Sequence, residues 1–268
     1  MFEAAGQTFQ LEADHSFKFS SLYAGDYTLT AKHVNQGKMA DLGFASVRIV
    51  DSDVRVDVEV GRAAEVHGRV QGSQGLSLTG KKITLETFGS GFYLLHQSSE
   101  LDASGRFSIS NLPPAEYTFA IYNRPSERSI YVKKAVCGGR DYAGHVFSLA
   151  IGATLDCDVV LGNDTGVIHG TASSGETPVP GVVVVLIPGS GELRRVPRYT
   201  LEAMTDAAGE YRIAGVIPGD YLMFAVPPSM DHAYYALDFA NRHLDIAEHV
   251  SMDPGATQIV NLKSSKLE

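Results

Sequence analysis

Hydrophobic and polar residues alternate along two stretches of the chain that repeat one another, Asp102–Ile121 and Asp206–Ala225. Each stretch opens on an Asp-x-x-Gly turn, continues with apolar residues near every second position, and closes on a strand headed by a tyrosine. Alternation with a period of two is typical of a strand that buries one face. The turn glycine precedes the tyrosine by twelve residues in both copies, as Gly105 with Tyr117 and Gly209 with Tyr221.

A third copy, Ser16–Ala31, is weaker at its turn and carries Tyr27 in the place of the tyrosine. We expect the glycines to close hairpins at positive φ, and the tyrosines to be packed with the hydroxyl bonded to backbone at the loop, as in the tyrosine corners of immunoglobulin-like sandwiches. The structural residues of the repeat are therefore Gly105, Tyr117, Gly209, Tyr221 and Tyr27. The three copies predict an all-β protein of tandem β-sandwich modules.

The repeat predicts three modules. Residues 1–61 form a first, partial module that lacks its first two strands, 62–162 a complete second module, and 163–265 a complete third module. We expect residues 266–268 to be the remnant of a cloning site. The opening strands of the complete modules are Val66–Val70 and Val167–Thr171.

The first module is predicted to hold a strand near Thr8–Glu12, a hairpin over Phe17–Lys32, a segment around Phe44–Val50 and an alternating strand over Val54–Val60. Because its first strands are lacking, we expect an exposed sheet edge or a rearranged partner strand.

The third module predicts one helix. Both faces of Tyr221–Val226 are apolar, and a strand buried on both faces needs a second cover. The segment 234–244 supplies Phe239 and Leu244, which fall on one side of a short helix. We expect this helix to pack across the outer face of the third module's sheet.

The 268 residues suit two or three modules of about 100 residues each. The net charge of −9, with no Lys/Arg stripe to reverse it locally, repels a phosphate backbone and argues against a nucleic-acid partner. No stretch approaches the roughly 18 to 20 apolar residues of a membrane span. No basic-then-apolar signal peptide opens the chain, and we expect the sequence to begin inside a module.

The two cysteines, Cys137 and Cys157, fall in the second module. Cys157 shares its phase with Leu155, Val159 and Leu161 and is predicted to point inward, whereas Cys137 is out of phase with Val132 and Val136. Opposite faces argue against a disulfide, while a bulge at Gly138–Gly139 would correct the phase and an oxidising compartment would favour the bridge. Both alternatives stay open.

The repeated strings Gly209–Tyr221, His169–Thr171 with Val179–Val182, and Leu155–Leu161 resemble carboxypeptidase regulatory-like domains. These are transthyretin-like or prealbumin-like sandwiches that often occur in tandem in bacterial secreted and cell-surface proteins. The resemblance covers nearly the whole chain and implies a location outside the cell or on its surface, with the periplasm as an alternative. The resemblance is specific for the fold. It does not single out one function, because such modules serve as spacers, stabilisers or binding accessories.

No catalytic, cofactor-binding or metal-binding residue is predicted. The nine histidines have neither HxxxH nor HxH spacing, and His67 and His169 occupy equivalent first-strand positions, which favours a structural role. No nucleophile elbow or Cys/His pair is present. The sequence therefore predicts a protein that is not an enzyme and needs no cofactor.

Two function classes remain. The first is a non-catalytic spacer or surface scaffold, with a cell-surface protein or polysaccharide as partner. The alternative is a carbohydrate-binding accessory module, because starch-binding-like sandwiches share this architecture and sugars stack on exposed aromatic rings. The chain has no Trp, so the candidate ligand-binding residues are tyrosines, for which packing on a sheet face is the competing interpretation. They are Tyr122, Tyr131, Tyr234 and Tyr235.

Overall fold

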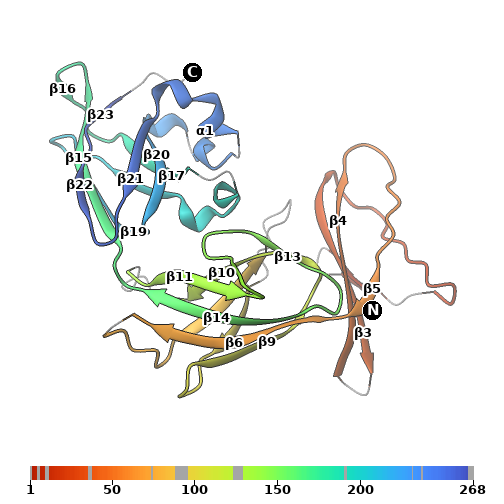
Figure 1. Cartoon of the computed structure of the whole chain (residues 1–268). Coiled ribbons are helices and arrows are strands. Elements are labelled where there is room, and N and C mark those ends of the chain that lie inside the picture. Colours follow the sequence, from red (N-terminus) through yellow and green to blue (C-terminus); the bar gives the residue numbers. More distant parts are fainter. Residues whose placement is uncertain are drawn as a thin grey trace. The chain divides into compact units, whose positions relative to one another are not determined.

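The computed structural model describes ten stretches of the chain, 2–4, 7–9, 12–35, 38–73, 75–87, 96–122, 129–189, 192–230, 232–236 and 238–264. Within them the fold is all-β, with short helical turns only in the C-terminal part (Figure 1). The chain divides into two compact units, the first made of residues 1–72, 77–122 and 132–160 and the second of 73–76, 123–131 and 161–268. No helix in the described ranges is both long and apolar enough to cross a membrane. The predicted fold class is confirmed, whereas the predicted tail 266–268 lies outside the described residues.

One five-stranded sheet forms the first module, in the order β2-β1-β3-β4-β5. The long antiparallel hairpin of β3 and β4 dominates it. Its strands are β1 (Phe2–Ala4), β2 (Gln7–Phe9), β3 (Gly25–Asn35), β4 (Lys38–Ile49) and β5 (Val60–Arg62).

The first module departs from its predicted strands at two places. Residues 12–24 carry no strand assignment, so the hairpin expected over Phe17–Lys32 is wrong in its first half, and β3 instead pairs with β1 and β4. Residues 51–59 carry none either, although Val54–Val60 alternate as a strand should. Alternation describes which faces a strand would bury, but a strand also needs a neighbour to pair with.

The second module is a sandwich of two sheets, ordered β8-β7-β10-β13 and β12-β11-β14-β6-β9. The alternating residues of the repeat point into it, because Phe107 and Ile109 of β9 and Tyr117, Phe119 and Ile121 of β10 are all buried. Its strands are β6 (Ala64–Gly72), β7 (Lys82–Thr87), β8 (His96–Glu100), β9 (Arg106–Leu112), β10 (Ala115–Tyr122), β11 (Tyr131–Cys137), β12 (Arg140–Asp141), β13 (Phe147–Leu149) and β14 (Thr154–Gly162).

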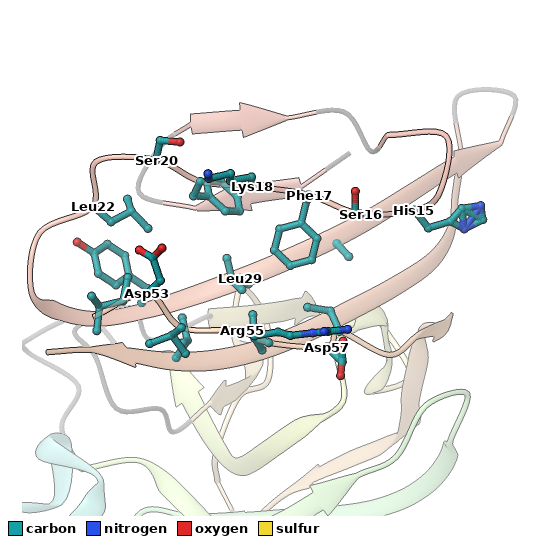
Figure 2. A pocket seen from close by; sticks show the side chains of 18 of the residues that line it. His15, Ser16, Phe17, Lys18, Ser20, Leu22, Leu29, Asp53, Arg55 and Asp57 are labelled. Carbon is teal, nitrogen blue, oxygen red and sulfur yellow. The ribbon is translucent and has the colours of Figure 1, made fainter. Parts of the chain in front are cut away.

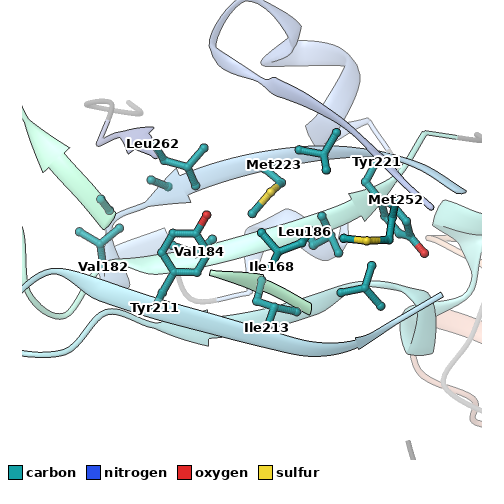
Figure 3. Close-up of a cluster of buried hydrophobic side chains, with 14 residues drawn as sticks. Ile168, Val182, Val184, Leu186, Tyr211, Ile213, Tyr221, Met223, Met252 and Leu262 are labelled. Atoms are coloured by element: carbon teal, nitrogen blue, oxygen red, sulfur yellow. The ribbon is translucent and has the colours of Figure 1, made fainter. Parts of the chain in front are cut away.

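The third module repeats this plan. One sheet has the order β18-β17-β20-β21, and in the other β15 lies between antiparallel β19 and the parallel strands β22 and β23. Figure 3 shows side chains from both sheets, among them Ile168, Leu186 and Met223, meeting in one core. The strands are β15 (Gly166–Ser174), β16 (Thr177–Pro178), β17 (Val183–Pro188), β18 (Leu201–Met204), β19 (Glu210–Val216), β20 (Gly219–Val226), β21 (Glu248–Met252), β22 (Thr257–Ile259) and β23 (Leu262–Lys263).

A short helix covers the outer face of β17 and β20, as predicted. It is α1 (Phe239–Arg242), preceded by a 3₁₀ turn at Ala233–Tyr235. Phe239 is fully buried and meets the ring of Phe224 edge-on at a centroid distance of 5.3 Å. Leu244, the second residue expected on the packed side, is instead 48% exposed, because the helix ends at Arg242 and a separate 3₁₀ turn follows.

Cys137 of β11 and Cys157 of β14 form a disulfide, so the argument from phase against a bridge was wrong. The inward residues of β11 are Tyr131, Ala135 and Cys137, whereas Val132 and Val136 lie on the partly exposed face. The two valines were the wrong reference for the phase, because a β-branched residue suits either face of a strand.

Candidate functional site

The turns of the second and third modules are built alike around an aspartate. One oxygen of Asp102, Oδ1, accepts the backbone N–H groups of Ser104 and Arg106, both at 2.8 Å. The hydrogen bond from the Arg106 N–H, followed by those from the Ser104 hydroxyl and N–H, holds the pKa of the Asp102 carboxyl below its usual value. Asp206 Oδ1 accepts N–H groups from the second and fourth residues after it in the same way, at 2.8 and 2.9 Å. Both carboxylates fix a turn, which is the common use of aspartate in such loops.

The turn residue itself lies in the left-handed region in all three modules. Gly105 and Gly209 have φ of 78° and 74°, and the first module places His15 there with φ of 66°. The backbone hydrogen bonds of that turn match those of the second module. Glu12 N–H donates to Ser16 O and His15 N–H to Glu12 O, both at 3.0 Å. Sequence reasoning missed His15 because it looked for a glycine. The signal was nevertheless present, since Tyr27 follows His15 by the same twelve residues.

A second left-handed position recurs six residues after the turn. It holds Ser21, Asn111 and Gly215 in the three modules, with φ of 61°, 60° and 76°. Three residue types share one backbone conformation, so the fold rather than the side chain sets it.

The tyrosine of each module bonds to the carbonyl four residues upstream. Tyr117 Oη donates to Pro113 O and Tyr221 Oη to Ile217 O, both at 2.7 Å. Tyr27 Oη donates to Tyr23 O at 2.8 Å in a more exposed setting. Burial raises the pKa of the Tyr117 and Tyr221 hydroxyls, so neither ionises near neutral pH. These hydroxyls anchor a loop.

The four tyrosines considered for ligand binding are not brought together. Tyr131 is 6% exposed and its hydroxyl donates to Asp164 Oδ1 at 2.8 Å. Tyr234 is 5% exposed and Tyr235 39%. Tyr122 ends β10, and its side chain lies outside what the structure describes.

Tyr234 and Tyr235 belong to a small cluster with His232 and Glu202. The hydroxyl of Tyr234 donates to the Glu202 carboxylate and lies 3.0 Å from His232 Nδ1. The two tyrosine rings are 5.0 Å apart and inclined at 41°, so they do not form one flat surface. Burial, and secondarily Glu202, raises the pKa of the Tyr235 hydroxyl. Three of the four candidate tyrosines have described side chains, and among these three only Tyr235 presents an exposed ring for stacking.

A large groove lies in the first module, at a place sequence reasoning did not single out as a site. Its cavity volume is about 1360 Å³, and its lining comes from residues 14–60. Figure 2 shows one rim running from His15 to Leu22 and the other through Asp53, Arg55 and Asp57, with Leu29 of β3 between them. The floor is apolar, since Leu29 and Ala31 are 3% and 2% exposed.

Comparison with known proteins identifies no family. No protein-family model matches the chain. Colossin-A of Dictyostelium discoideum is 24% identical over 250 residues, which cover 82% of this chain and 2% of Colossin-A. The chain thus spans a small fraction of that relative's length.

Three solved structures show a low similarity. A streptococcal ancillary pilin aligns over 92% of this chain and 77% of its own, with 11% identity and a TM-score of 0.33. GBS52, a minor pilin of Streptococcus agalactiae, aligns over 76% and 97%, with 13% identity and a TM-score of 0.33. The Bacillus anthracis TIE protein aligns over 89% and 42%, with 13% identity and a TM-score of 0.26. At these TM-scores the similarity adds nothing to the fold described above.

Proposed function

We propose that the chain is a non-catalytic structural part of a secreted or cell-surface protein, a spacer or scaffold of tandem carboxypeptidase regulatory-like modules with boundaries after residues 61 and 162. The proposal rests on the hydrogen-bond partners of the polar side chains that recur from module to module. The turn aspartates of the second and third modules and the tyrosine of every module bond to their own backbone. Side chains bonded in this way hold loops in place, so the features that the modules share make each module rigid.

The disulfide supports a location outside the reducing cytosol. Cys137 and Cys157 join β11 to β14 across 20 residues of chain. Disulfides form and persist in secreted, surface and periplasmic proteins and are rare in the cytosol. The partner that suits such a scaffold is another surface protein or a polysaccharide.

Single-molecule pulling on the whole chain tests the spacer role. Modules that carry load unfold in discrete steps at measurable force, and the disulfide keeps the segment between the cysteines from extending. Adding a reductant should lengthen the extension of that step by about 70 Å, the reach of about 20 residues. Featureless extension at low force would contradict a load-bearing role.

A glycan panel tests the carbohydrate-binding alternative. We expect no saturable binding to insoluble polysaccharides or soluble glycans, because only Tyr235 of the described candidate rings is exposed. Saturable binding that Tyr235→Ala abolishes and Tyr235→Phe retains would put the carbohydrate-binding function first. Tyr131→Phe is the control, since its buried ring cannot stack on a sugar.

A further inference from the structure

The first module has no counterpart of one strand that both other modules possess. Its sheet order β2-β1-β3-β4 corresponds to β8-β7-β10-β13 and β18-β17-β20-β21, with the tyrosine strand third in each. β1 and β2 therefore stand for the second and third strands of a module. The segments that take the places of β9 and β14 are present in the first module, although they are not paired as strands. For the opening strand, β6 or β15 in the other modules, no described segment takes the place, so the module lacks one strand and not the two expected from the sequence.

In the complete modules the opening strand lies between two others. β6 lies between β9 and β14, and β15 lies between β19 and the parallel strands β22 and β23. The corresponding segments of the first module are residues 16–22, which follow the turn, and 54–60, which close the module. These are the two rims of the groove, and the space between them is the place of the opening strand (Figure 2).

The closing rim, residues 54–60, has the residue pattern of a strand over a segment that is mostly not paired as one. Val56 and Val58 are half-buried while Arg55, Asp57 and Glu59 are exposed, which is the alternation of a strand with one face inward. Yet no strand pairing is assigned to residues 51–59, which include most of one of the two segments that would border the added strand. An edge of this kind is a template for pairing with another polypeptide.

The two opening strands show what such a strand must contain. Their inward positions alternate small or β-branched residues with a central glycine, and a Cβ added at Gly68 or Gly170 would lie 1.9 Å from a carbonyl oxygen of the closing segment. The glycine is required because that backbone passes so close. The inward residues are Ala64, Val66, Gly68 and Val70 in β6, and Gly166, Ile168, Gly170 and Ala172 in β15.

We propose that the groove of the first module binds, as an added β-strand, an extended polypeptide segment with this glycine-centred pattern that is not part of the 268 residues. Backbone pairing with both rims supplies affinity, and alternate side chains over Leu29 and Ala31 supply specificity. The groove is larger than the roughly 300 to 1,000 Å³ of small-molecule pockets, and a seven-residue rim runs about 23 Å when extended. A second copy is the less suitable donor, because its own β6 and β15 are already paired on both sides.

The test uses the whole chain and a labelled synthetic peptide with the sequence of β6, Ala64–Gly72. We expect saturable binding at one peptide per chain, with slower amide hydrogen exchange in residues 16–22 and 54–60. A matched peptide carrying Gly68→Val should bind at least about tenfold more weakly, because its Cβ would collide with the closing segment.

Two protein variants separate the groove from non-specific binding. Val56→Asp places a charge on the inward face of one rim and should weaken peptide binding about tenfold or more, whereas Glu59→Gln changes an exposed residue outside the groove lining and should leave it unchanged. Circular dichroism and a thermal melt check that both variants fold.

Three results would overturn the proposal. The first is no binding and no exchange protection up to about 1 mM peptide. The second is equal binding of the Gly68→Val peptide, which would mean adhesion without strand pairing. The third is a concentration-dependent dimer that protects the same rims, which would make a second copy the occupant. None of these results bears on the spacer role.

Discussion

At the scale of single residues, the modules reuse backbone conformations more faithfully than side chains. The position twelve residues before each tyrosine is left-handed whether it holds glycine or His15, and the position six residues later is left-handed with serine, asparagine or glycine. A residue other than glycine carries a conformational cost there, of about 1 to 3 kcal/mol. The first module bears this cost at both positions.

Replacing His15 by glycine should therefore stabilise the protein. We expect His15→Gly to raise the free energy of unfolding by about 0.5 to 1 kcal/mol, the released strain being partly offset by the greater freedom of glycine in the unfolded chain. Urea denaturation of the purified chain measures it.

The matched control is the reverse change in the third module. Gly209→Ala should destabilise by about 1 to 3 kcal/mol, because φ is 74° and the new Cβ would lie 3.0 Å from Ala172 O. A neutral Gly209→Ala would show that the left-handed turn is not the constraint.

The tyrosine hydroxyls of the modules should contribute different amounts to the free energy of unfolding. Tyr117→Phe removes the donor to Pro113 O from a buried site and should cost about 1 to 3 kcal/mol in the free energy of unfolding. Tyr27→Phe removes the same bond from an exposed site and should cost less than about 0.5 kcal/mol. Equal losses in the two variants, measured by chemical denaturation, would contradict the dependence on burial.

At the scale of elements, α1 exists because one strand has two apolar faces. The inward face of β20 joins the core of the sandwich, and its outward residues Leu222, Phe224 and Val226 need another cover. Phe239 and Ala240 of α1, with Tyr234, supply it. A four-residue helix has no stability of its own, so packing on the sheet holds it in place.

Truncating Phe239, the buried ring of α1, should lower the stability of the protein strongly. Phe239→Ala removes a fully buried ring and is expected to lower the free energy of unfolding by about 3 to 5 kcal/mol. Leu244→Ala, at a side chain that is 48% exposed, should change it by less than about 0.5 kcal/mol. Thermal unfolding of both variants checks the pair, and a large loss with Leu244→Ala would restore the original expectation that this residue packs.

At the scale of the whole molecule, the two compact units differ in how they are stabilised. The disulfide lies in the first unit, and the second contains no cysteine. Closing a loop of about 20 residues contributes about 3 kcal/mol in the chain-entropy view. Reduction of the disulfide should therefore lower the stability of the first unit and leave that of the second unchanged.

Replacing both cysteines by alanine tests this difference. The double variant should lose about 3 kcal/mol in the first unit, with the hydrogen exchange of residues 161–264 unchanged. Adding dithiothreitol to the wild-type chain should reproduce the loss. An equal loss in both units would show that they unfold together.

The sequence by itself determined the all-β fold, the tandem modules and the helix over the third sheet. Each followed from a local pattern: alternation along strands, a turn and a tyrosine at fixed spacing, and one strand apolar on both faces. Such patterns report which faces must be buried, and the hydrophobic effect makes that requirement nearly independent of detail.

Only the tertiary structure decided which segments and side chains lie beside one another. It placed Cys137 on the inward face of β11, buried Tyr131 and Tyr234, and left residues 51–59 unpaired as a strand despite their alternation. The pairing of a strand, the phase of a cysteine and the exposure of a ring depend on which segment comes to lie beside them. That neighbour is remote in the chain, so no local pattern specifies it.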